Sequence, residues 1–118
     1  MATFHHLTLA YLQAAIWADL TIDDKGTPDD EATLNDIAPE SLAEADTLCR
    51  AFADKHAGDI DGWDARAGHD LWLTRNRHGA GFWDGDWPEP AATRLTDAAH
   101  ALGEATIYRG DDGKIHID

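Results

Sequence analysis

The stretch GHDLWLTRNRHGAGFWDGDW, residues 68–87, decides both the fold class and the candidate site of this 118-residue chain. It contains three of the five tryptophans and two of the seven histidines. Residues 69–76 alternate, with Leu71 and Leu73 on one side and mostly polar or aromatic residues on the other. Because successive side chains of a strand point to opposite faces, this alternation predicts a strand. A glycine-containing turn follows, so residues 81–84 are predicted to return as the second strand of a hairpin.

Three other segments have apolar residues at the three- and four-residue spacing of an amphipathic helix. They are residues 7–18, 40–57 and 91–103. The start of the 40–57 segment is the best marked, because Ser41 and Glu44 form the serine-x-x-glutamate pattern of a capping box. The sequence therefore predicts three helices.

The C-terminal residues 105–118 contain Asp112-Gly113 between two runs of β-prone residues, which is a strong hairpin signal. Residues 20–39 are interrupted by proline and glycine and are predicted to form a long acidic loop. The predicted order is helix, helix, hairpin, helix, hairpin within a single domain, residues 1–118. This is an α+β fold in which three helices pack on a small antiparallel sheet of about four strands.

Acidic residues dominate the charge, since 23 aspartates and glutamates oppose 9 lysines and arginines, for a formal charge of −14. Fourteen of these acids lie between Asp19 and Asp64. Direct binding to nucleic acid is disfavoured, because contacts with phosphates require basic side chains. No apolar run is long enough to span a membrane, and the single Cys49 excludes an intrachain disulfide. A cytoplasmic protein is the simplest expectation.

We predict an acidic binding surface on the long loop and on the start of the helix that follows it. Carboxylates spaced along these segments can take positions that phosphates occupy on a nucleic acid, so the expected partner is a basic protein. The predicted acidic surface consists of Asp23, Asp24, Asp29, Asp30, Glu31, Asp36, Glu40 and Glu44.

The central stretch supplies a second candidate binding surface. Tryptophan and arginine are frequent anchors of protein interfaces, and the predicted hairpin carries both. The residues of this aromatic and arginine block are Trp72, Arg75, Asn76, Arg77, His78 and Trp83. A structural role suits the stretch equally, because its tryptophans can cover both faces of a thin sheet while its polar side chains bond to backbone groups. A folding nucleus and a scaffold with a contact surface are both consistent with the sequence.

An enzymatic alternative uses the same hairpin. His69, Asp70, Asn76 and His78 would surround a divalent cation, as in metal-dependent nucleases that use a histidine base. Three features oppose it: the short spacing between His69 and Asn76, the scarcity of ligands in the next helix, and the repulsion between an acidic chain and DNA. The sequence also lacks a nucleophile elbow and a phosphate-binding loop. We therefore assign no catalytic residue, no metal and no cofactor.

Several motifs together resemble an uncharacterised family of small acidic proteins encoded by phages and prophages. They are Tyr11-Leu12 with Trp17, Ala38-Pro39-Glu40, the central residues 68–84, and residues 108–113 in the closing segment. The central block of that family reads GHDFWLTRNGHGAGFWDR. The resemblance implies a phage origin and location in the host cytoplasm, and it implies no reaction. Two positions differ, because Arg77 replaces the usual glycine and Gly85 replaces the usual arginine.

The sequence therefore predicts a small acidic phage or prophage protein that binds a basic host protein, for example as a nucleic-acid mimic that inhibits a defence or transcription complex. A metal-dependent nuclease or hydrolase is the first alternative. The second is a soluble accessory protein whose charge only prevents aggregation. A homodimer is a further expectation, because an exposed tryptophan of the central block can equally contact a second copy.

Overall fold

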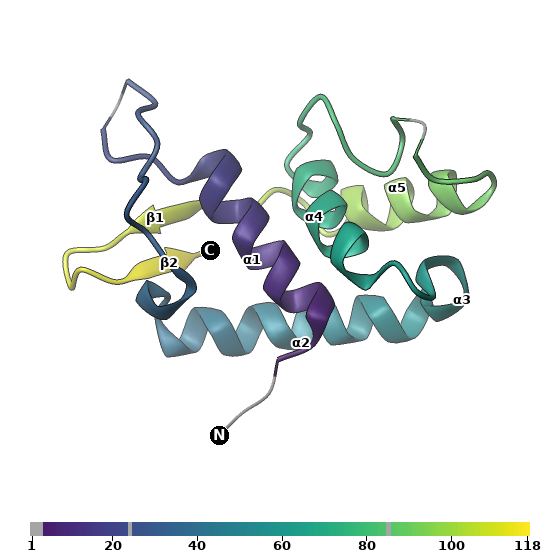
Figure 1. Ribbon diagram of the computed structural model, residues 1–118, viewed down its shortest axis with the longest axis horizontal. Coiled ribbons are helices and arrows are strands. Elements are labelled where there is room, and N and C mark those ends of the chain that lie inside the picture. Colours follow the sequence, from purple (N-terminus) through teal and green to yellow (C-terminus); the bar gives the residue numbers. More distant parts are fainter. Residues whose placement is uncertain (1–3, 24, 85) are drawn as a thin grey trace.

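The computed structural model describes residues 4–23, 25–84 and 86–118 and is mostly helical. The helices are α1 (His6–Asp19), η1 (Leu34–Asp36, a 3₁₀ helix), α2 (Pro39–Lys55), α3 (Ala57–Ile60), α4 (Asp64–Arg75) and α5 (Ala91–Ala101), and the strands are β1 (Ile107–Arg109) and β2 (Ile115–Ile117). Figure 1 shows α2 along one side of the molecule, with the hairpin near one end of it and α3, α4 and α5 toward the other. Within the described residues, no helix combines the length and apolarity that crossing a membrane requires.

The fold differs from the predicted arrangement in the central stretch. Residues 69–76, predicted as a strand, form the second half of α4 and its C-cap, and residues 81–84 are irregular instead of a return strand. The described residues therefore contain one hairpin and a two-stranded sheet, where two hairpins and about four strands were expected. The three predicted helices are present as α1, α2 and α5, and the C-terminal hairpin is formed by β1 and β2.

The alternation in residues 69–76 is misleading because residues 70–75 of α4 are buried on all sides. Leu71, Trp72, Leu73 and Thr74 follow one another in the sequence, and all four are buried. A helix that is surrounded by protein has no polar face, so the helical period is lost from its sequence. Two leucines separated by one residue then have the spacing of a strand face without forming one.

The contact between α1 and α4 is the most extensive between any two described elements, and Gly68 sets their separation. A Cβ atom at Gly68 would lie 2.1 Å from the carbonyl oxygen of Leu7 and 2.9 Å from the amide nitrogen of Tyr11. The two backbones therefore approach more closely than a larger residue permits. Beside this crossing the rings of Tyr11 and Trp72 meet edge to face, with centroids 5.3 Å apart.

The segment that follows α4 folds back into the core. Phe82 is fully buried, and its ring lies 5.9 Å from Phe52 and 5.3 Å from Trp87, measured between centroids. Its amide donates to the Thr74 hydroxyl oxygen at 3.0 Å. The preceding Gly81 has φ +147°, and a Cβ atom there would lie 2.1 Å from the same hydroxyl oxygen. Glycine is therefore required where this segment meets α4.

The hairpin rests on the N-terminal end of α2. β1 and β2 pair antiparallel, with Tyr108 opposite His116. The amide of Ala38 donates to the carbonyl of Ile115 at 2.8 Å, and the amide of Ile117 donates to a serine hydroxyl in the first turn of α2 at 3.1 Å. The acidic loop leaves α1 and returns beside this hairpin, so both lie at one end of the molecule (Figure 1).

We expect Gly68→Ala to lower the free energy of unfolding by about 1–3 kcal/mol, because the added methyl group would force α1 and α4 apart. Gly79→Ala is the matched control, since Gly79 lies in the same stretch and a Cβ atom there meets nothing within 4 Å. Unfolding in denaturant measures both variants. Equal unfolding midpoints would contradict the close crossing of the two helices.

Candidate functional site

The predicted aromatic and arginine block does not form one surface. Trp72 and Arg75 are buried, so the structure places two of its expected anchors in the core. The indole N–H of Trp72 donates to Asp19 Oδ2 at 2.6 Å. The guanidinium of Arg75 donates to the carbonyl oxygens of Gly103 at 2.8 Å and of Leu102 at 3.2 Å. These side chains hold α4 to α1 and to the chain after α5, and they are not exposed to a partner.

Arg75 also bonds to a tyrosine inside the core. Its Nη1 donates to the hydroxyl oxygen of Tyr11 at 2.8 Å. Burial raises the pKa of Tyr11 to about 12, although the positive charge of Arg75 opposes the rise. Burial likewise raises the pKa of Cys49 to about 12, so its thiol is protonated at neutral pH. Neither group is therefore available as a nucleophile.

Asn76, Arg77 and His78 end α4, in place of the hairpin turn expected there. The side-chain oxygen of Asn76 accepts a bond from the amide of Ala105 at 2.8 Å. The amide of His78 donates to the carbonyl of Leu73 at 2.9 Å, and Arg77 between them is left-handed, with φ 58°. These features form a Schellman motif, in which the left-handed position usually holds glycine.

Of the remaining residues of the block, Arg77 and Trp83 lie on the surface, and His78 contacts the half-buried carboxylate of Asp19. Arg77 and Trp83 are exposed, and Trp83 retains 53% of its accessible surface. The ring of His78 is half-buried, and its Nε2 lies 2.9 Å from Asp19 Oδ2, the same oxygen that accepts the bond from Trp72. Of the six predicted residues, Arg77 and Trp83 are thus the ones fully available to a partner.

The four residues of the nuclease alternative do not surround one point, although His69 Nδ1 lies 3.4 Å from Asp70 Oδ1. His69 packs near Trp17 of α1, with ring centroids 5.7 Å apart, whereas His78 lies beyond the C-terminal end of α4. Asp70 points inward and accepts a 2.7 Å bond from the indole of Trp87. Within the described residues, no group of three histidine, cysteine, aspartate or glutamate side chains is placed to hold a metal. The hairpin on which this alternative depends is replaced by α4.

Several carboxylates of the predicted acidic surface hold the loop itself. Asp23 accepts a 3.1 Å bond from the amide of Thr27, and this bond is the main cause of its lowered carboxyl pKa. Asp29 accepts two bonds from the guanidinium of Arg109, at 2.9 and 3.3 Å. Asp36 accepts a 2.9 Å bond from the amide that precedes η1. These three side chains act as structural acceptors inside the loop.

The other loop carboxylates face outward. Asp30, Glu31 and Glu40 are exposed, and their side chains have no hydrogen bond or ion pair within the described part of the chain. Asp24 of the predicted acidic surface lies outside the described residues, as does Gly85 of the central stretch. The predicted acidic surface therefore separates into carboxylates that shape the loop and carboxylates that are free to contact a partner.

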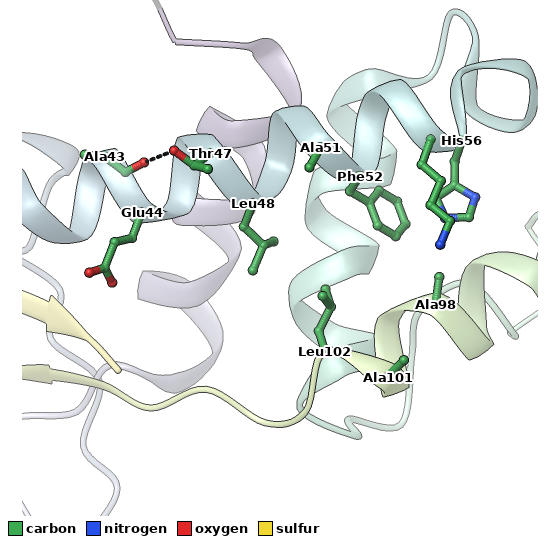
Figure 2. A pocket seen from close by; sticks show the side chains of 11 residues that line it. Ala43, Glu44, Thr47, Leu48, Ala51, Phe52, His56, Ala98, Ala101 and Leu102 are labelled. Atoms are coloured by element: carbon green, nitrogen blue, oxygen red, sulfur yellow. Dashed lines mark hydrogen bonds between the residues drawn. The ribbon is translucent and has the colours of Figure 1, made fainter.

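An apolar groove of about 680 Å³ lies between α2 and the end of α5. Figure 2 shows Leu48 and Phe52 pointing from α2 toward the side of the groove that carries Leu102, with Glu44 farther along the same face of α2. Glu44, the last residue of the predicted acidic surface, thus belongs to the groove and not to the loop. Lys55 lines the groove near the opposite end of α2. An apolar lining between an acid and a base is suited to a helical segment with matching charges.

His56 lines the groove next to Lys55. Its side chain is 10% exposed, and its Nε2 is buried without a hydrogen-bond partner in the described residues. The ring packs on Phe52, with centroids 4.6 Å apart. Burial lowers the pKa of His56, so the imidazole is neutral at pH 7.

The groove was not predicted from the sequence. The apolar residues Leu48 and Phe52 belong to the helical stripe of residues 40–57, which indicates burial in the core. One signal lies beside that stripe, where Ala43, Thr47 and Ala51 follow one another at every fourth position. Small side chains in such a row let a second helix approach closely.

Comparisons of the chain with protein-family models, curated proteins and solved structures find no match. The resemblance to small acidic phage proteins therefore stays an expectation from the sequence. The functional conclusion rests on the contacts and charges of this chain.

We expect Arg77→Gly to raise the free energy of unfolding by about 0.5–1 kcal/mol, because glycine adopts the left-handed conformation without the steric cost of a Cβ atom. Glycine is also the residue that the resembled family carries at this position. Arg77→Ala is the control, since it removes the charged side chain and keeps Cβ. In thermal unfolding the glycine variant should melt above both wild type and the alanine variant. Equal melting temperatures for the two variants would argue against a left-handed cap at this position.

Proposed function

We propose that this chain is a small acidic binding protein, of phage or prophage origin, that engages a basic host protein and performs no catalysis. The observation that carries the proposal is an acidic loop whose shape is fixed by its own carboxylates. The remaining carboxylates on such a loop can occupy positions in the partner that nucleic-acid phosphates otherwise take. Charge complementarity of this kind speeds association and selects the partner.

Three contacts fix the loop. A β-bridge between Thr21 and Pro28 closes its first turn. Arg109 of β1 binds Asp29 in the middle of the loop. The end of the loop bonds to β2 just before α2 begins. A loop that is ordered before binding loses little conformational entropy on binding, so its charges contribute more of their interaction energy to affinity.

The free carboxylates gather at the end of the molecule that holds the loop and the hairpin. Asp30, Glu31 and Glu40 are exposed there, and the turn between β1 and β2 adds Asp111. Arg109, a base in the same region, is already neutralised by its bonds to Asp29. One lysine of the loop and one of the hairpin turn offset part of the charge. The surplus is negative, which supports a basic partner.

Affinity capture from host lysate tests the proposal with paired charge reversals. The double variant Asp30→Lys with Glu31→Lys should lose about tenfold or more of the partner captured by wild type at low salt. The matched control is Asp54→Lys with Asp97→Lys, which makes the same change in net charge at exposed positions on α2 and α5. The control should retain capture, and high salt should release the partner from wild type and control alike.

Two outcomes would contradict the proposal. Full capture by the loop variant would remove the loop from the interface. An equal loss in the loop variant and the control would mean that net charge alone attracts the captured protein, and the chain would then be the soluble accessory protein of the second alternative.

A further inference from the structure

We infer that the groove between α2 and α5 is the contact surface of a symmetric homodimer, in which α2 of each copy lies antiparallel in the groove of the other. The occupant of the groove is therefore a second copy of this chain. The dimer is independent of the proposed basic partner, because it uses α2 and α5 and leaves the acidic loop exposed.

The face of α2 that lines the groove has a self-complementary spacing. Glu44, Leu48, Ala51 and Lys55 all line it, and they are separated by four, three and four residues. This is the repeat of about 3.5 residues that contact positions follow between two packed helices. The spacing is the same from either end. Two antiparallel copies centred between Leu48 and Ala51 thus place Glu44 opposite Lys55 and Leu48 opposite Ala51.

The charges select the antiparallel arrangement. In a parallel pair, Glu44 would face Glu44 and Lys55 would face Lys55, which is repulsive at both ends. Within one copy the two residues are roughly 16 Å apart along the helix, so they do not pair with each other. Neither side chain has an ion-pair partner among the described residues. In the dimer, Glu44 of each copy pairs with Lys55 of the other. The two-fold symmetry therefore forms this ion pair twice.

The centre of the same face is apolar, and its small side chains let a second helix approach closely. Leu102 retains 39% of its accessible surface at the end of α5, although it is a large apolar side chain. Ala51 and Ala101 are exposed on either side of the groove. Filling the groove with α2 of a second copy removes this apolar surface from water, which favours association.

The net charge of −14 on each copy opposes the dimer. Repulsion between two such copies is screened as salt concentration rises, so the dimer should strengthen from low to moderate salt. Binding to a basic partner through the loop should weaken over the same range. The two associations are therefore distinguished by the sign of their salt dependence.

A charge-swap series tests the dimer by sedimentation equilibrium over the micromolar range at moderate salt. Glu44→Lys and Lys55→Glu should each raise the dimer dissociation constant by about tenfold or more, because each variant puts like charges opposite one another at two places. The double variant with both changes restores opposite charges and should dimerise like wild type. Glu31→Lys is the control for net charge, and it should leave the dimer intact or strengthen it.

The inference is overturned if wild type is a monomer over the whole concentration range, or if a wild-type dimer is unaffected by both single variants. It is also overturned if the double variant is no more dimeric than the single variants. Circular dichroism verifies that each variant is folded.

Ala51→Glu gives a second test at an exposed position, since a carboxylate opposite Leu48 should abolish the dimer without any change in helix content.

Discussion

The burial of α4 depends on hydrogen-bond partners for the polar groups that this helix and its neighbours carry into the core. The indole of Trp72 donates to Asp19, and Asp70 accepts a bond from the indole of Trp87. Arg75 donates to two carbonyl oxygens beyond α5. A buried polar group left without such a partner costs about 1–3 kcal/mol, and a charged group costs more. The helix occupies the interior because these partners are in place.

The same bonds connect the core to the surfaces proposed for binding. Asp19 is the last residue of α1, so its bond to the core fixes the point at which the acidic loop begins. Asn76, at the end of α4, bonds to Ala105 and positions the chain that enters the hairpin. The hairpin in turn holds the loop through the contact between Arg109 and Asp29. The positions of the exposed loop carboxylates therefore depend on the position of α4 in the core.

Segments whose structure is decided locally could be predicted from the sequence. Residues 40–57 have a polar and an apolar face, and residues 105–118 contain a strong turn signal, so both were correctly predicted. Residues 69–76 were wrongly predicted as a strand, because residues 70–75 are buried on every side of the helix. Such burial is a tertiary property that removes the helical period. The acidic loop was predicted as a binding surface. The sequence could not show which carboxylates hold the loop in shape, because Arg109, the base that binds Asp29, is 80 residues away along the chain.

Hydrogen exchange at the indole N–H groups, followed by NMR, tests the interior placement of residues 68–87 most directly. Trp72 and Trp87 are 0% and 5% exposed and donate to the carboxylates of Asp19 and Asp70, so their indoles should exchange only at the rate set by global unfolding. Trp17, Trp63 and Trp83 are exposed and serve as internal references for fast exchange. If Trp72 exchanges as fast as Trp17, then α4 is not the interior helix on which the fold depends.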